Sequence, residues 1–305
     1  MSRILITGSL GAVGLPLWRC LQDRGHDVHG CDLRQSDLSN YDRCDVADYR
    51  LLASLFDEHE FDIVYHAAAE FGRNNGERHY EALWRTNAIG TKNILRLQEE
   101  RRFRLVVFSS SEVYGDWPHI MTEEVLDEHP IKQMNDYAIT KWVNELQVLN
   151  SAARFGTETV RVRLFNTYGP GEYYTPFRSV ICVFIYSALH GIPYSVYLGH
   201  HRTSTYVDDA VRTLANITDN FVPGAVYNIA GDAYHDIKSV SDLILEKLGK
   251  DDRLVTYVPF EEHNTKDKRT DAARARADLR HEVTVGLEEG LERTIAWQRA
   301  TYGAG

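Results

Sequence analysis

Hydrophobic and polar residues follow two different periods along the first half of the chain. Short apolar runs, rich in β-branched residues, have the length of strands that are buried on both faces of a sheet. Longer stretches between them repeat apolar residues at helical spacing. The runs that predict strands are Arg3–Thr7, Asp27–Asp32, Asp62–Ala67, Arg104–Ser109 and Glu158–Arg163. The stretches that predict helices are Ala12–Arg24, Asp48–Glu58, Tyr80–Arg101 and Asn135–Phe155.

This alternation predicts an α/β fold with a right-handed, doubly wound parallel sheet. After Gly169-Pro170-Gly171 the rhythm changes to short elements, aromatic loops and turn residues. We therefore expect a sheet domain over residues 1–168. A smaller C-terminal lobe is expected over residues 169–305, with some segments returning to the sheet domain. Ligands of such sheets bind at the carboxyl ends of the strands, so the lobe should cover that edge and bind the substrate.

Composition narrows the class of function. The 305 residues carry a formal net charge of -10, which argues against non-specific nucleic-acid binding, and no apolar run is long enough to span a membrane. The opening residues do not resemble a signal peptide, and four scattered cysteines fit a cytoplasmic setting. His200 and His201 have no third ligand at useful spacing, so no metal site is predicted. A local arginine pocket can still hold phosphates on an acidic protein.

Gly8, Gly11 and Gly14 form a glycine-rich turn between the first predicted strand and the first predicted helix. Glycine permits the tight turn and lets the backbone approach a pyrophosphate, while the helix N-terminus offers free N–H groups. The turn is therefore typical of a dinucleotide site.

Asp32 closes the second predicted strand and supports the same interpretation. Its carboxylate can accept both ribose hydroxyls of the adenosine and would repel a 2′-phosphate, so NAD is favoured over NADP. Arg34 nearby is the feature that would favour NADP. Asp45 and Val46 are placed to meet the edge of the adenine ring.

Tyr137 and Lys141 stand four residues apart in a predicted helix, so both project from one face. A tyrosine that accepts a proton near neutral pH must ionise far below its usual pKa of about 10. A lysine ammonium one turn away and a cationic nicotinamide would both stabilise the phenolate. The pair is therefore the candidate for the acid–base centre of a dehydrogenase.

These features join further motifs in a resemblance that runs nearly end to end. The motifs are the glycine turn, Asp32, His66-Ala67-Ala68-Ala69, Ser109-Ser110-Ser111-Glu112-Val113-Tyr114-Gly115, the Tyr137/Lys141 pair, Arg163–Pro170, Tyr206–Asp209 and Gly286–Leu291. Together they resemble the extended short-chain dehydrogenase/reductase family, and within it the nucleotide-sugar epimerases, 4,6-dehydratases and decarboxylases. The resemblance implies a Rossmann fold, NAD as cofactor and a nucleotide sugar as substrate.

The resemblance also implies roles for individual residues. Ser110 would hydrogen-bond the 4-hydroxyl of the sugar, and Tyr137 would remove its proton as hydride passes to NAD⁺. Asn166 and Arg178 match positions that hold the nucleotide diphosphate, and Tyr197 falls near the nucleobase segment. The expected cofactor-binding residues are Gly8, Gly11, Ala12, Val13, Gly14, Asp32, Asp45, Val46, Ala67, Ala68, Ala69, Asn87, Ser109, Tyr137 and Lys141. The expected substrate-binding residues are Glu70, Arg73, Ser110, Glu112, Tyr137, Asn166, Arg178, Tyr197 and Arg202.

The segment Ser110-Ser111-Glu112 bears on which reaction follows the oxidation. The 4,6-dehydratases carry Thr-Asp-Glu there, and the aspartate protonates the departing hydroxyl, whereas Ser111 is too weak an acid for that task. The Ser-Glu-Val-Tyr-Gly pattern resembles UDP-glucuronate decarboxylases, and Arg202 occupies the position of their carboxylate-binding arginine. Glu70, by contrast, resembles the dehydratases and would repel a carboxylate. Decarboxylation to UDP-xylose or UDP-4-keto-xylose is therefore the leading expectation. A 4,6-dehydratase, a 4-epimerase and a non-catalytic NAD-sensing protein are the alternatives.

Two further expectations concern surfaces. The predicted helices Tyr80–Arg101 and Asn135–Phe155 lie where family members form a homodimer interface. Its apolar stripe would comprise Leu83, Ile94, Leu95, Val143 and Leu146, unless these residues cover their own sheet instead. The segment Lys266–Arg280 carries both signs of charge and is expected to form a solvated helical face.

Overall fold

The computed structural model describes residues 1–259 and 261–303. Its main sheet has seven parallel strands in the order β11-β6-β5-β4-β1-β2-β3. These strands are β1 (Arg3–Thr7), β2 (Asp27–Asp32), β3 (Tyr41–Arg43), β4 (Ile63–His66), β5 (Arg104–Ser110), β6 (Thr159–Leu164) and β11 (Val226–Ile229). The order reverses between β1 and β4, which is where such sheets bind ligands. The prediction of a Rossmann-type doubly wound sheet is confirmed.

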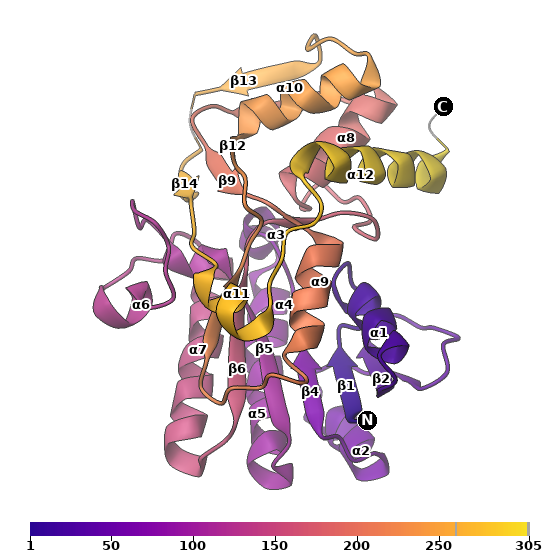
Figure 1. Ribbon diagram of the computed structural model, residues 1–305, viewed down its shortest axis with the longest axis vertical. Coiled ribbons are helices and arrows are strands. Elements are labelled where there is room, and N and C mark those ends of the chain that lie inside the picture. Colours follow the sequence, from indigo (N-terminus) through magenta and orange to yellow (C-terminus); the bar gives the residue numbers. More distant parts are fainter. Residues whose placement is uncertain (260, 304–305) are drawn as a thin grey trace.

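Helices cover both faces of this sheet, because each strand presents apolar side chains on both sides (Figure 1). The helices in this layer are α1 (Gly14–Asp23), α2 (Tyr49–Glu58), α5 (Gly90–Arg101), α7 (Asp136–Phe155), α9 (Val207–Asn216) and α11 (Ala273–Leu279). One buried cluster joins α1 and α9 to one face, and a second joins α2 and α5 to the other. Asn135 caps α7, because its side-chain oxygen accepts from the Ala138 amide at 2.9 Å.

The predicted helix Tyr80–Arg101 is helical throughout but contains a change of pitch. It comprises α4 (Tyr80–Trp84), the π-helical turn η1 (Arg85–Ile89) and α5, and the short helix α3 (Arg73–Arg78) precedes it. Single π turns often occur beside functional sites, and this one carries Thr86, which lines the cavity described below.

The chain after residue 169 lies mainly above the carboxyl ends of the parallel strands (Figure 1). The elements there are α8 (Val180–His190), β8 (Tyr194–Tyr197), β9 (His201–Thr203), β12 (Tyr234–Asp236), α10 (Ile237–Leu248), β13 (Val255–Val258), β14 (Asp267–Lys268) and α12 (Leu287–Tyr302). The remaining short elements are η2 (Ser111–Tyr114), α6 (Val125–Glu128), β7 (Thr167–Tyr168) and β10 (Thr205–Tyr206). In this half of the chain, β11, α9 and α11 return to the main sheet. The division at residue 168 stays a prediction.

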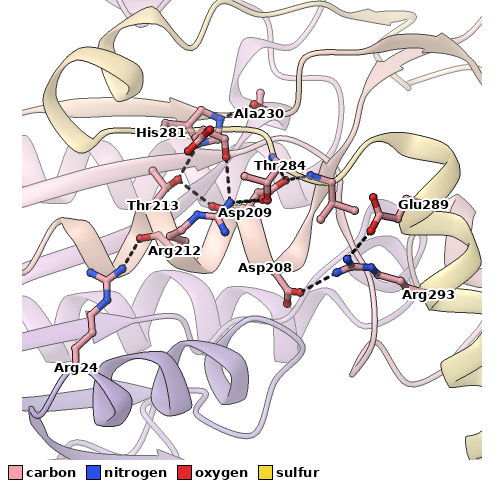
Figure 2. A network of polar contacts seen from close by, with 12 residues as sticks. Arg24, Asp208, Asp209, Arg212, Thr213, Ala230, His281, Thr284, Glu289 and Arg293 are labelled. Carbon is pink, nitrogen blue, oxygen red and sulfur yellow. Dashed lines mark hydrogen bonds and ion pairs between the residues drawn. The ribbon is translucent and has the colours of Figure 1, made fainter.

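A buried polar network ties this returning chain to the segment that leads into α12. Figure 2 shows Asp209 of α9 directed at Thr284. The fully buried Asp209 carboxylate accepts from the Thr284 amide at 3.1 Å, the Thr284 hydroxyl at 2.7 Å and the Val285 amide at 3.1 Å, and it pairs with Arg212. His281 contacts the Thr213 hydroxyl and the Ala230 carbonyl, each at 2.7 Å. The Tyr206–Asp209 motif thus anchors the chain that closes the lobe.

The structure shows which residues of the expected dimer stripe are exposed. Leu83, Ile94 and Leu95 are buried within the chain itself. Ile94 and Leu95 belong to the buried cluster that joins α2 and α5 to the sheet, which agrees with the alternative expectation that they cover their own sheet. Leu146 is 46% exposed and remains available to a partner. The homodimer stays a prediction. No helix in the described ranges has both the length and the hydropathy of a membrane-spanning segment.

Candidate active site

A cavity of about 670 Å³ opens at the carboxyl edge of the sheet. Most of the residues predicted from the sequence line it, although they come from many separate segments. The predicted residues in its wall are Gly8, Gly11, Ala12, Val13, Gly14, Asp32, Asp45, Val46, Ala67, Ala68, Ala69, Glu70, Ser109, Ser110, Ser111, Glu112, Tyr137, Lys141, Asn166 and Arg178. Four others, Asn87, Arg73, Tyr197 and Arg202, lie behind this wall or beyond it.

The glycine turn builds one end of the cavity. Gly8 has a φ of +68°, and a Cβ there would lie 2.7 Å from the backbone nitrogen of Ala68. A Cβ on Gly14 would lie 2.2 Å from the Gly8 carbonyl oxygen, so both positions require glycine. Among the described residues no side chain caps the start of α1. Its open N–H groups therefore suit the pyrophosphate of a dinucleotide.

Asp32 stands at the end of β2, beside this turn. Its carboxylate accepts from the Leu10 amide at 3.1 Å and from the Arg34 amide at 3.2 Å, which fixes its orientation. The Arg34 guanidinium lies 3.5 Å from the same carboxylate. Arg34 is thus held by Asp32 as an ion pair, which reduces the charge that it offers to a 2′-phosphate. The residues at this end fit NAD.

Asn87 supports the cavity from behind. It is buried on the π turn, its side-chain oxygen accepts from the Glu70 amide at 2.9 Å, and its nitrogen donates to the Glu70 carbonyl at 3.0 Å. The same nitrogen donates to the Thr140 hydroxyl at 3.1 Å. Asn87 therefore fixes the loop after β4 against α7, while its neighbour Thr86 lines the cavity.

The Tyr137/Lys141 pair of α7 meets the end of β5 near the middle of the cavity. Lys141 donates to the Phe108 carbonyl at 2.8 Å, and its Nζ lies 5.9 Å from the centroid of the Tyr137 ring. Burial lowers the pKa of Lys141 to about 8. Burial raises the pKa of Tyr137 to about 12, against a hydrogen bond with Ser110 that lowers it, and the charge of Glu112 raises it further. A bound cation is therefore needed to make Tyr137 a base near neutral pH.

Ser109 precedes this centre and has a structural partner. Its hydroxyl donates to Glu145 at 2.6 Å. Glu145 is fully buried and also pairs with Arg163 at 2.8 Å and Arg161 at 3.2 Å. Burial alone would raise the pKa of the Glu145 carboxyl, but the two arginines hold it below its usual range. This charge cluster fixes β5 against α7 and β6.

Glu112 and Lys268 form an ion pair in the cavity wall, next to Ser110. The Ser110 hydroxyl accepts from the Glu112 amide at 3.2 Å, and Lys268 donates to one Glu112 carboxylate oxygen. The other oxygen, Oε2, is buried and has no hydrogen-bond partner among the residues the structure describes. Burial alone would raise the pKa of Glu112, but Lys268, Arg202 and Arg73 hold it below its usual range. Glu112 therefore stays a carboxylate.

Lys268 was missed by the sequence reasoning. It lines the cavity and is only 2% exposed, so the expected solvated helical face over Lys266–Arg280 is wrong at this residue. The segment forms the short strand β14 and then α11, rather than one helix. A single lysine within a mixed-charge run gives no local signal of burial.

Arg202 and Arg73 lie beside this pair without lining the cavity. Arg202 is buried and donates to the His201 and Lys266 carbonyls, each at 2.8 Å, and to the Asn264 side chain at 3.2 Å. Arg73 forms an ion pair with Glu261. Both act on Glu112 through charge rather than by direct contact with it.

The remaining predicted substrate residues are spread over the outer wall. Glu70 accepts from the Asn75 side chain at 2.9 Å. The Arg178 guanidinium lies 3.8 Å from the centroid of the Phe71 ring. Asn166 has a φ of +38° and donates to the Thr203 carbonyl at 2.9 Å, which holds this turn below the lobe.

Tyr197 ends β8, away from the cavity wall, with its ring 6.4 Å from that of His200. Another missed residue is Glu172, a buried acid in the wall that accepts from the Ser179 hydroxyl at 2.7 Å. Burial raises the pKa of Glu172.

Known proteins share this sequence pattern and this architecture. Residues 4–230 match the family described as the NAD dependent epimerase/dehydratase family. A UDP-N-acetyl-alpha-D-glucosaminuronate decarboxylase of Bacillus cytotoxicus is 30% identical over 317 residues, covering 97% of this chain and 98% of that protein. A dTDP-glucose 4,6-dehydratase of Salmonella typhimurium is 25% identical, covering 98% of this chain and 93% of that protein. The solved structure of MoeE5 in complex with UDP-glucuronic acid and NAD matches with a TM-score of 0.87 and 26% identity, over 98% of this chain and 99% of that one.

Proposed function

We propose that this chain, which belongs to the NAD dependent epimerase/dehydratase family, oxidises a nucleotide-linked uronic acid at its 4-hydroxyl and then decarboxylates it. The cofactor is NAD. The 30% identical relative is a decarboxylase of a nucleotide-linked uronic acid, and MoeE5 was solved with a uronic acid nucleotide. Both support a substrate of that class.

The oxidation uses the centre formed by Ser110, Tyr137 and Lys141. Ser110 would hold the 4-hydroxyl, and the Tyr137 phenolate would take its proton. When bound, NAD accepts a hydride from carbon 4 and so leaves a ketone there. The Lys141 ammonium, whose Nζ lies 5.9 Å from the centroid of the Tyr137 ring, would stabilise the phenolate by its charge.

The charge around Glu112 is the observation that carries decarboxylation. Three cations act on this one carboxylate, namely Lys268, Arg202 and Arg73; Arg73 also pairs with Glu261, and the charge of Asp267 acts on Arg202. Of these three cations Lys268 lines the cavity, so its ammonium can meet an anionic carboxylate there.

The same observation weakens the case for dehydration. A departing hydroxyl needs an acid, but Ser111 is too weakly acidic and Glu112 is held in its charged form. A 4-keto uronic acid needs no such donor to lose carbon dioxide. Its C5–C6 bond breaks and the electron pair enters the C4 carbonyl, where the Ser110 and Tyr137 hydroxyls can donate to the enolate oxygen.

The 4,6-dehydratase remains the second candidate because Glu70 lines the cavity and would repel a uronate carboxylate facing it. Mass spectrometry of products from UDP-glucuronate, UDP-glucose and dTDP-glucose separates the reactions. Loss of carbon dioxide from UDP-glucuronate supports the proposal. Loss of water from dTDP-glucose would replace it with dehydration, and a product of unchanged mass would replace it with epimerisation. No reaction with any substrate would favour a binding protein.

Two variants test the assignment of the second step. Glu112→Gln and Arg202→Ala should still form NADH on mixing with substrate, because oxidation precedes the step in which they act. Release of carbon dioxide should slow in both. Normal turnover in both variants would contradict the decarboxylase assignment.

A further inference from the structure

Lys268 is a buried lysine whose position the proposed reaction has not yet used. It is 2% exposed, lies in the cavity wall and donates to Glu112. A lysine ammonium has three N–H donors, and the structure pairs one of them with a described residue. The other two are free to meet a ligand in the cavity.

Strand pairing places Lys268 beside Arg202, and the hydrogen bonds of Arg202 explain why Lys268 faces the cavity. Strand β14 runs parallel to β9, with Lys268 in register with Arg202. Register partners in a sheet project to the same face. The Arg202 guanidinium turns back to the carbonyls of His201 and Lys266, so of this pair it is Lys268 that lines the cavity.

Glu112 links the Lys268 ammonium to the segment that carries Ser110. Glu112 follows Ser110 by two residues, and Ser110 hydrogen-bonds Tyr137. The 4-hydroxyl of the sugar would lie between Ser110 and Tyr137, with carbon 5 adjacent to it. Glu112 itself is held as a carboxylate and so cannot supply a proton to that carbon.

We propose that Lys268 is the catalytic acid that protonates carbon 5 of the sugar after decarboxylation. This role rests on the proposed function. When the C5–C6 bond breaks, carbon dioxide leaves and the electron pair forms the C4–C5 enolate. A proton then passes from the Lys268 ammonium to carbon 5, the enolate returns to a C4 ketone, and the neutral amine regains a proton from solvent.

The surroundings of Lys268 suit this transfer. Burial lowers its pKa to about 8, the Glu112 carboxylate raises it, and Arg202 and Arg73 lower it. These are the charged groups that face Lys268 from η2, β9 and α3. An acid with a pKa near the working pH is protonated at rest and still gives up its proton readily.

Two substitutions separate proton donation from charge. Lys268→Arg keeps a positive charge, but a guanidinium does not give up its proton in proteins. Lys268→Met removes both. The matched control is Lys266→Met, because Lys266 is an exposed lysine two residues away in the same segment. The substrate is UDP-glucuronate with NAD⁺, and the measurements are NADH formation, carbon dioxide release and the position of deuterium in product formed in D₂O.

Lys268→Arg should form NADH normally and keep KM within about threefold, while kcat for the complete reaction falls by about 10²-fold. Lys268→Met should also raise KM. In the wild type, deuterium should enter one face of carbon 5, whereas both variants should give a mixture of faces because water then supplies the proton. Above pH about 8 the wild-type rate of carbon dioxide release should fall relative to the rate of NADH formation, since the Lys268 ammonium is the active form, and Lys268→Arg should lack this relative decline. Loss of the Lys141 ammonium above the same pH changes NADH formation itself.

Two outcomes would overturn the proposal. One is Lys268→Arg with wild-type kcat, and the other is single-face deuteration in both variants. If Lys268 had only a structural role, its variants would lose NADH formation to the same extent as carbon dioxide release. The measurement of NADH formation would detect this. If the wild type releases no carbon dioxide from any uronic acid nucleotide, the proposed function fails first, whatever Lys268 does.

Discussion

Replacing Lys141 by methionine should slow the oxidation in a way that depends on pH. The Lys141 Nζ lies 5.9 Å from the Tyr137 ring centroid. Two unit charges about 6 Å apart interact by about 3 kcal/mol at an effective dielectric constant of about 20, and we expect an effect of this size on the phenolate. That energy corresponds to a change of about 2 in the pKa of Tyr137. The wild-type ammonium is present below pH about 8 and lost above it. Near neutral pH, Lys141→Met should therefore oxidise substrate about 10²-fold more slowly.

The loss should shrink above pH about 8, because the wild type then also loses its Lys141 ammonium. The assay is the initial rate of NADH formation across neutral to alkaline pH, with saturating substrate. Tyr137→Phe is the control, since without a phenol no pH restores the rate. Substrate affinity, measured by calorimetry, should be unchanged in both. An equal loss at every pH in Lys141→Met would refute the electrostatic argument and leave Lys141 only a structural role.

Three further outcomes are expected. NAD⁺ should bind at least tenfold more tightly than NADP⁺, a difference of about 1.4 kcal/mol, and Asp32→Ala should remove that difference. If calorimetry shows equal affinities in the wild type, Arg34 rather than Asp32 determines the choice of cofactor. Asp209→Ala removes the acceptor of the buried Val285 amide and of the part-buried Thr284 amide, so the free energy of unfolding in urea should fall by about 2 kcal/mol or more (Figure 2). A homodimer should appear by light scattering at micromolar concentration, and Leu146→Lys should weaken it; a monomeric wild type would reject the dimer.

The sheet and its helices could be predicted because their physics is local. Strands buried on both faces leave continuous apolar runs, and the five predicted runs agree with β1, β2, β4, β5 and β6 to within a residue at each end. The π turn at Arg85–Ile89 could not be predicted, since the helical period continues across it. Strands β3 and β11 were not predicted, because both are short and β11 joins the sheet only after the chain has passed through the lobe.

The cavity was predictable where one short segment both forms an element and supplies the chemistry. The glycine turn, the Ser110–Glu112 segment and the Tyr137/Lys141 pair are of this kind, and all line the cavity. The position of Arg202 in the sequence could not predict where its side chain lies in the fold. The carbonyls and side chain that bind its guanidinium come partly from residues 264 and 266, which are far from it in sequence.

The same distinction explains why the type of reaction is harder to predict than the oxidation. The groups that would oxidise the sugar lie on β5, η2 and α7, which are fixed by the regular half of the chain. The charge at the sugar end depends on Lys268 and Arg202, which meet only because the two short strands β14 and β9 pair across a large sequence separation. A mixed-charge segment costs nothing to leave in solvent, so burial of Lys268 is driven by that pairing and by the Glu112 carboxylate, not by its local pattern. Relatives can therefore keep the oxidising centre and change the following step by altering residues that no short motif contains.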